Sequence, residues 1–337
     1  MTKFERLFSQ LPESIDCVLI TSDINRRYFT GMKSSDGTVI AFRDKAYLII
    51  DFRYIEKARA TVTEAEVIEQ KKLYAQLAEL IRDHKAANMA IEAQTLTVSR
   101  LHTLRAQLRD VEVIDTDVLS NAINSLRSVK DEYELGCIKK AQEIAEKALA
   151  DVLGFIRDGV TERQIALELN RLMFDYGAED LSFETIVLSG ANTSMPHGVP
   201  SDKKVQRGEF VLMDFGAVYE GYHSDMTRTV CVGEPDGEMR KVYEIVLEAQ
   251  TAAINAAHAG MTGHGSCFGH SLGHGVGLEI HERPNASPNF MQPLNEGAVV
   301  TVEPGIYIAG KFGVRIEDFV ILTENGCINL TKSAKNI

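Results

Sequence analysis

The chain has 337 residues, of which 45% are hydrophobic and 25% charged, and its formal net charge is −12. This length predicts two domains, and the composition is that of a folded globular protein rather than a disordered or fibrous one. The acidic excess disfavours nucleic acid and anionic membrane surfaces as partners.

The N-terminal segment and the cysteines predict a cytoplasmic protein. Residues 1–17 lack the apolar segment of a signal peptide. No run of about 18 apolar residues predicts a membrane span. The five cysteines are widely spaced and form no C-x-x-C pair, so we expect reduced thiols rather than disulfides or a cysteine zinc site.

Residues 1–125 alternate strand and helix patterns, which predicts an α/β domain. Apolar runs predict strands, and helical spacing of apolar residues predicts helices. The expected strands are Cys17–Thr21, Thr38–Phe42, Ala46–Asp51, Asn88–Glu92 and Val111–Ile114, and the expected helices are Leu73–His84 and Ser99–Leu108. No glycine-rich loop follows a strand here, which argues against a nucleotide site.

Residues 126–337 form the second expected domain, reached through a linker at Asn121–Lys130. A helix is expected from Asp131 toward Phe155, ended by Gly159. A capping box at Thr161–Gln164 predicts the next helix, which ends at Gly177. Strands are expected at Phe183–Ser189 and Phe210–Ala217.

The C-terminal part repeats this plan, which predicts an α+β domain with internal pseudo-symmetry. A long helix is expected at Glu238–His258, followed by strands at Val299–Val302 and Val314–Leu322. Only nine residues separate Gly260 from His270. The second helix of this half is therefore predicted to be missing or reduced to a loop.

Two pairs of acidic residues occupy symmetric positions in two apolar hairpins. Asp214 and Asp225 flank a turn predicted at Val218–Gly221, and Glu303 and Glu317 flank Gly310. In an antiparallel ladder each pair would face across the strands, where like charges are destabilising. One such acid is more often a solvated surface charge, but two mirrored pairs predict a bound cation.

The segment Phe268–Glu282 supplies imidazoles, with His270, His274 and His281 among the nine histidines of the chain. Glycines flank His274 and permit close approach of the backbone. Four carboxylates and one imidazole make an oxygen-rich site for two divalent ions such as Mn²⁺, Co²⁺ or Zn²⁺. Paired ions of this kind lower the pKa of a bridging water.

These residues resemble those of the creatinase/prolidase/methionine aminopeptidase superfamily, whose catalytic domain has the "pita-bread" fold (family M24). The matching stretches are PHG at 196–198, MDFGAVYEGYHSDMTRTV, GHSLGHGVGLEIHERP, TVEPGIY and GVRIED. INRRYFTG and DFRY are typical of the creatinase-type N-terminal domain, so the resemblance favours the Xaa-Pro aminopeptidase and Xaa-Pro dipeptidase branch.

The resemblance implies a metal cage and a substrate pocket. Asp214 would chelate one ion, Asp225 and Glu317 would bridge both, and His274 and Glu303 would complete the shell of the other, with manganese as the expected metal. Glu303 would also act as general base. The implied catalytic or substrate-binding residues are His281, for the oxyanion, and His197, His270, Arg315 and Tyr307.

The implied activity is hydrolysis of the bond after the first residue of Xaa-Pro peptides, by a hydroxide held between the ions. An Xaa-Pro dipeptidase is the alternative, and the resemblance also implies a homodimer. The short segment before His270 departs from the family. It leaves open a natural variant, a deletion or a decayed enzyme. The other classes are a creatinase-like hydrolase without metal and a non-catalytic binding protein, and the retention of all five ligands argues against both.

Overall fold

The computed structural model describes residues 1–262, 273–286 and 292–337. The chain folds into two compact units, Met1–Arg127 and Ser128–Ile337. Within the described residues, none of the helices combines the length and the apolar character that crossing a membrane requires.

The first unit contains a mixed six-stranded sheet in the order β4-β3-β2-β1-β5-β6. The hairpin β2–β3 and the pair β1–β2 are antiparallel, whereas β1–β5, β5–β6 and β3–β4 are parallel. Its elements are α1 (Lys3–Gln10), β1 (Cys17–Ile20), α2 (Asp23–Thr30), β2 (Thr38–Phe42), β3 (Ala46–Ile50), α3 (Ile55–Thr61), β4 (Glu66–Glu69), α4 (Leu73–Asp83), β5 (Asn88–Ile91), α5 (Val98–Gln107), β6 (Glu112–Ile114) and α6 (Val118–Ser128).

The central strands of this sheet are buried along their whole length, which shows that both faces of the sheet are covered. Alternate residues of one strand face opposite sides of a sheet, so an unbroken buried run needs cover on both faces. On one face Leu77 of α4 and Leu104 of α5 pack against Leu19 and Ile40. All the strands and helices predicted for this domain are present within a few residues of their expected ends.

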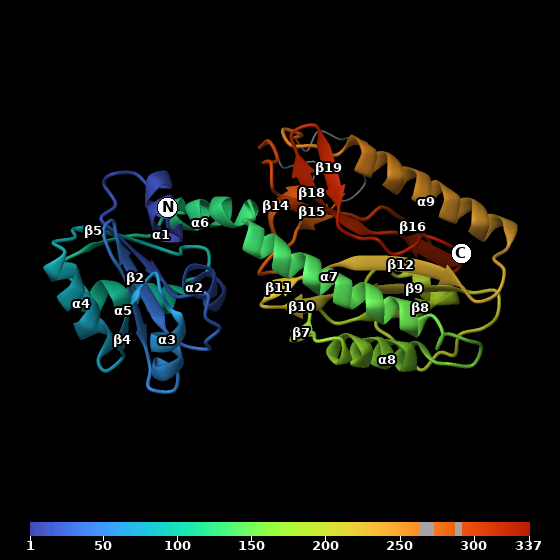
Figure 1. Ribbon diagram of the computed structural model, residues 1–337, viewed down its shortest axis with the longest axis horizontal. Helices are drawn as coiled ribbons and strands as arrows, with labels where there is room; N and C mark the ends of the chain where they lie inside the picture. The colour runs from blue at the N-terminus through green and yellow to red at the C-terminus, as the bar shows by residue number, and fades with distance from the viewer. Residues whose placement is uncertain (263–272, 287–291) are drawn as a thin grey trace. The chain divides into compact units, whose positions relative to one another are not determined.

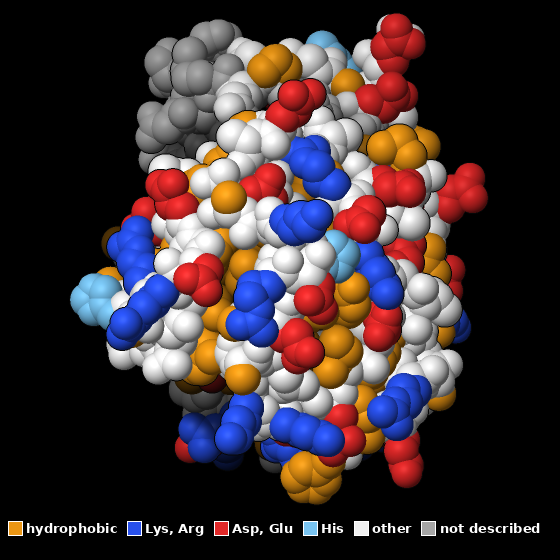
Figure 2. Space-filling model, turned by 90° about the vertical axis from the view of Figure 1, so that its left-hand side faces the viewer, with side chains coloured by type: hydrophobic (Ala, Val, Ile, Leu, Met, Phe, Trp, Pro, Cys, Tyr) orange, Lys and Arg blue, Asp and Glu red, His pale blue; other side chains and the backbone are white. Residues whose placement is uncertain are grey.

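The surface shown in Figure 2 is the side on the left of Figure 1. Acidic and basic side chains are interspersed over it, and hydrophobic side chains lie in small groups between them. This face therefore carries both signs of charge, although the chain as a whole has a net charge of −12.

The second unit is built from long helices and short antiparallel strands. Its sheets have the orders β12-β9-β8, β11-β10-β7, β14-β13-β15-β18-β19 and β16-β17. Its elements are α7 (Glu132–Val152), α8 (Glu162–Asp175), β7 (Asp180–Leu181), β8 (Ile186–Ser189), the 3₁₀ helix η1 (Gly190–Ser194), β9 (Phe210–Phe215), β10 (Ala217–Tyr219), β11 (Tyr222–His223), β12 (Met226–Cys231), α9 (Gly237–Ala256), β13 (Gly273–Gly275), β14 (Glu282–Ala286), β15 (Val299–Val302), β16 (Gly305–Ile308), β17 (Phe312–Arg315), β18 (Asp318–Thr323) and β19 (Gly326–Asn329).

Helices lie on both sides of the strands in this unit. In Figure 1, α7 and α8 lie on one side of β9 and β12, and α9 lies on the other. Ile144 of α7 and Leu169 of α8 belong to the same buried cluster as Met213 of β9. Val246 of α9 packs in a second cluster with Phe210 and Val314. The helices thus cover the strands that carry the acids, as the predicted pita-bread architecture requires.

The capping boxes explain where the helices of the first half begin. Asp131 caps α7 with its partner Glu134, and Thr161 caps α8 with Gln164 as predicted. The predicted linker Asn121–Lys130 contains the division between the two units at Arg127 and Ser128, but it is not an irregular connection, because α6 runs through most of it. Its apolar residues Ile123 and Leu126 are buried, which favours a packed helix over an exposed connection.

The expected pairing of Asp214 with Asp225 is wrong by two residues. In the ladder Asp214 pairs with Thr227. The turn lies at Glu220 and Gly221, which both have positive φ (48° and 78°), and not one residue earlier. Positive φ at both central residues characterises the two-residue hairpin turn, and a shifted turn shifts every pair beyond it. The two aspartates are therefore diagonal neighbours.

The second hairpin has the predicted register. Val302 pairs with Asp318 and Gly305 pairs with Arg315, so Glu303 lies opposite Glu317 between two short ladders. Gly310, at φ 72°, occupies the predicted turn. The predicted loss of a helix concerns residues 261–269, of which 263–269 lie outside the described part of the chain.

Candidate metal centre

One cavity of about 430 Å³ in the second unit brings the predicted chemistry together. All five predicted metal ligands line it, although they come from β9, β13 and the segments next to β12, β15 and β18. The lining also includes His197, His281 and Arg315 and an apolar part formed by Phe183, Ile186, Val199 and Ile280. The sequence-distant motifs therefore form one site.

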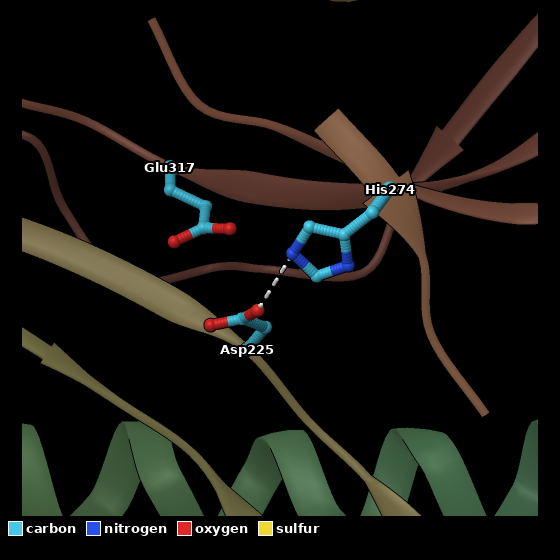
Figure 3. Close-up of side chains that lie close together, drawn as sticks. All are labelled: Asp225, His274 and Glu317. Atoms are coloured by element: carbon cyan, nitrogen blue, oxygen red, sulfur yellow. Dashed lines mark ion pairs between the residues drawn. The ribbon is translucent and has the colours of Figure 1, made fainter. Parts of the chain in front are cut away.

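Asp225, His274 and Glu317 form the centre of this group. Their side chains point toward one another, as Figure 3 shows, and one ligand atom from each lies within 4.8 Å of the others. His274 Nε2 is 3.4 Å from Asp225 Oδ2 and 3.5 Å from Glu303 Oε1. Three elements distant in sequence thus direct oxygen and nitrogen donors at one small volume.

The backbone around His274 is held by close packing. A Cβ on Gly273 would lie 2.0 Å from the carbonyl oxygen of Thr301, so only glycine fits there. His274 donates its backbone N–H to Thr301 Oγ1 at 3.0 Å, and this hydroxyl donates to Glu303 Oε1 at 3.1 Å. One threonine therefore orients two of the predicted ligands.

The imidazole of His274 is oriented for ligation. Its Nδ1 lies 3.2 Å from the carbonyl oxygen of Gly275, to which it can only donate, and this leaves Nε2 with its lone pair toward the acids. That tautomer is the one in which a histidine binds a metal through Nε2 while the other ring nitrogen is held by a carbonyl.

Asp214 and Glu317 are held from the side by Arg315 and Thr227. Arg315 Nη2 donates to Asp214 Oδ2 at 2.5 Å and Nη1 donates to the Tyr307 hydroxyl at 2.8 Å. Thr227 Oγ1 accepts from Arg315 Nε at 3.0 Å and donates to Glu317 Oε2 at 2.8 Å. A continuous hydrogen-bonded chain therefore connects Asp214 to Glu317.

Three of the acids have raised pKa values, because they are buried and lie close to other carboxylates. Burial, together with the charges of Asp214 and Glu303, raises the pKa of Asp225 well above its ordinary value. Burial and the charge of Asp225 do the same to the pKa of Glu317. Burial also raises the pKa of Glu303. Closely spaced carboxyls of this kind hold protons until a cation replaces them.

The donor set fits divalent metal ions. Asp214 Oδ1 is buried and has no hydrogen-bond partner among the described residues. A buried carboxylate oxygen without a partner is costly, and a metal ion would satisfy it. Carboxylate oxygens with one imidazole suit hard or borderline divalent ions rather than soft ones.

The remaining predicted residues lie around this centre, with one outside the described chain. His197 and His281 line the cavity, and the rings of His281 and His274 are 4.3 Å apart between centroids. Burial and neighbouring His274 lower the pKa of His281. Tyr307 contacts the site through Arg315. His270 falls within residues 263–272, which the structure does not describe.

Sequence reasoning missed the two threonines that hold the ligands. Thr227 and Thr301 are each two residues from a predicted acid, Asp225 and Glu303. Residues two apart in a strand lie on the same face of the sheet. This spacing could therefore have predicted that the two threonines lie beside the ligands.

The sequence matches a known family model in each part of the chain. The model of the metallopeptidase family M24 matches residues 136–266 and 262–324, and that of the creatinase/prolidase N-terminal domain matches residues 10–129. The chain belongs to metallopeptidase family M24. This M24 chain is therefore a hydrolase, and the metallopeptidases of its family use divalent metals.

Relatives of this M24 peptidase match it over nearly its whole length. An Xaa-Pro dipeptidase of Pyrococcus furiosus is 39% identical, covering 99% of this chain and 99% of the relative. A solved Xaa-Pro dipeptidase from Bacillus anthracis has a TM-score of 0.94 at 39% identity and covers 99% of both chains. An X-Pro aminopeptidase from Thermotoga maritima has a TM-score of 0.90 at 38% identity, covering 98% of this chain and 100% of that one.

Proposed function

We propose that this M24 metallopeptidase removes the first residue from peptides with proline in second position and uses two divalent ions. The observation that carries the proposal is the convergence of Asp214, Asp225, His274, Glu303 and Glu317 on one cavity. The names of the relatives supply the preference for proline, because no described residue of the cavity selects an imide bond by itself.

The proposed ligands divide between the two ions. Asp214 would hold one of them, His274 and Glu303 would hold the other, and Asp225 and Glu317 would be shared by both. Ions held this way would lower the pKa of a bound water and polarise a carbonyl oxygen. We propose manganese, because four carboxylates with one imidazole suit it.

The protein's own residues supply the remaining steps. Glu303 would accept a proton from the attacking water and pass it to the leaving proline nitrogen, since its carboxylate lies at the cavity. His281 donates a hydrogen bond to the carbonyl oxygen of the scissile bond as charge develops there. Its lowered pKa keeps its imidazole neutral at neutral pH.

A dipeptidase that accepts only Xaa-Pro is the second candidate, which the names of several relatives favour. The two activities differ in whether the substrate must end at proline. Hydrolysis of an Xaa-Pro dipeptide is therefore to be compared with hydrolysis of a longer peptide that begins with the same two residues. Comparable or faster cleavage of the longer peptide supports the aminopeptidase, and cleavage of the dipeptide alone supports the dipeptidase.

The test of the common claim is hydrolysis of this peptide series by protein reconstituted with manganese. The matched control is Asp225→Asn, which keeps the shape of a proposed bridging ligand and removes its charge. We expect manganese-dependent release of the first residue by the wild type and a loss of at least about 100-fold in the variant. Equal activity of the two proteins would contradict the proposal.

A further inference from the structure

Glu162 is a buried carboxylate whose hydrogen bonds lead to the substrate side of the cavity. It is the first residue of α8 and is 0% exposed. Ser189 donates to Glu162 Oε1 through its backbone N–H at 2.6 Å and through Oγ at 3.0 Å, and Asn192 Nδ2 donates to the same oxygen at 3.0 Å. Ser201 donates to Oε2 through its N–H at 3.0 Å and through Oγ at 2.6 Å.

These donors come from both ends of one loop, residues 190–200, here called the His197 loop. Ser189 and Asn192 lie where the chain enters it from β8 into η1, and Ser201 lies directly after it. The backbone N–H of Arg163 also donates to the carbonyl oxygen of Ser201 at 3.0 Å. A residue that served only to cap its helix would bond to the N–H groups of that helix, but these bonds cross to the loop.

The loop fastened in this way forms part of the cavity wall. His197, Gly198, Val199 and Pro200 all line the cavity. On the inner side, Arg315 Nη1 donates to the carbonyl oxygen of Pro196 at 3.2 Å, and the same guanidinium holds Asp214. The His197 loop is therefore anchored to Glu162 at its two ends and to Arg315 in its middle.

We propose that Glu162 is a positioning residue, which fixes the His197 loop and through it the binding of the substrate. Its charge is matched by five hydrogen bonds and by the positive end of the α8 dipole, so the buried carboxylate is stabilised only while both ends of the loop are in place. The part of this proposal that concerns substrate rests on the proposed peptidase function.

The test is Glu162→Gln, with Glu168→Gln as the matched control. Glutamine offers one acceptor oxygen and one NH₂, so some of the five donors then face another donor. Glu168 lies on the same helix and pairs with the exposed Arg171, away from the loop. We expect Glu162→Gln to raise KM for an Xaa-Pro peptide about tenfold, with kcat and metal content nearly unchanged, and the control to change neither.

A double-mutant cycle with His197→Ala separates positioning from a general loss of structure. If Glu162 acts through the His197 loop, Glu162→Gln adds little to the KM of the His197→Ala enzyme. Full additivity of the two KM effects, or loss of bound metal in Glu162→Gln, would overturn the proposal. If that variant does not fold, Ser201→Ala removes a single donor and is expected to raise KM in the same direction by a smaller factor.

Amide hydrogen exchange tests the anchoring without any activity. Exchange of the amides of residues 189–201 is expected to be at least about tenfold faster in Glu162→Gln than in the wild type and the Glu168→Gln control. Unchanged exchange in this segment would overturn the role of Glu162. A wild type that cleaves no Xaa-Pro peptide but shows this difference would instead remove the proposed function and leave the anchoring intact.

Discussion

Arg315 and Asp214 form a largely buried ion pair whose nitrogen and oxygen lie 2.5 Å apart. Only Oδ2 of the aspartate takes part in the ion pair, and Oδ1 has no hydrogen-bond partner among the described residues. Burial opposes the charge on Arg315, but Asp214, Tyr307 and Glu317 together outweigh it, and the pKa of the guanidinium is raised. The pair thus holds one proposed ligand in place and leaves an oxygen for a metal ion.

Arg315→Ala is expected to lower the free energy of unfolding of the metal-free protein by about 3 kcal/mol. The reason is that it leaves Asp214 buried without its partner. Denaturant unfolding measures the change. The control is Arg163→Ala, whose exposed pair with Asp202 is expected to be worth less than about 1 kcal/mol. Equal losses in the two variants would show that the ion pair is not important for stability.

Gly273→Ala is expected to weaken metal binding and to destabilise the protein by about 2 kcal/mol or more, because the added Cβ would meet the backbone of Thr301. Gly136→Ala in α7 is the control, since a Cβ there meets nothing within 4 Å. In a helix interior that change is expected to stabilise by about 0.5–1 kcal/mol. Thermal unfolding and metal titration of both variants give the comparison, and an unaffected Gly273→Ala would refute the close packing behind His274.

The stabilisation that manganese confers is expected to grow with pH. Burial raises the pKa values of Asp225, Glu317 and Glu303, so the folded metal-free protein binds more protons than the unfolded chain above about pH 4. Its free energy of unfolding therefore falls as pH rises through the folded pKa values. Metal ions replace those protons and oppose this loss. The test is to measure the free energy of unfolding with and without manganese at about pH 5.5 and about pH 8. An equal increase on adding manganese at both pH values would contradict the prediction.

His281→Ala is expected to lower kcat for an Xaa-Pro peptide roughly 100-fold while the metal content stays the same, because it removes one donor to the developing oxyanion. His258→Ala, at the end of α9, is the control and is expected to leave kcat unchanged. Steady-state kinetics together with metal analysis distinguish a lost donor from a lost metal site. A full loss of metal in His281→Ala would assign this residue a different role.

Much of this architecture could be predicted because short sequence patterns, such as capping boxes and turn glycines, indicate the same helices and turns that the structure contains. The capping box at Thr161, the turn at Gly310 and the long helix at Glu238–His258 are each marked by residue types with one preferred conformation. All five proposed ligands were predicted as well, since acids inside apolar strands and glycines around a histidine are unusual.

The rest depended on contacts that no local pattern reveals. The short helices α1, α2 and α3 have eight residues or fewer, too few for a clear periodicity. The register of Asp214 depended on one turn, in which Glu220 adopts a positive φ that non-glycine residues rarely take. Glu162 reads as an ordinary first-turn acid, and only the fold shows that it bonds to the His197 loop.

The match to the family model is divided at residues 262–266, which is where the sequence predicts a shortened connection. The prediction of a missing helix concerns residues outside the described structure, whereas the ligands after this point are brought together. We therefore expect the shortened connection to leave the metal centre intact.

The number of divalent ions bound by each chain is the most direct test of the central claim. Elemental analysis of purified protein, after equilibration with manganese and removal of unbound metal, measures it. The convergence of Asp214, Asp225, His274, Glu303 and Glu317 predicts two ions per chain in the wild type and fewer in Asp225→Asn. A wild type that retains no ions would contradict the metal centre and the peptidase chemistry proposed for it.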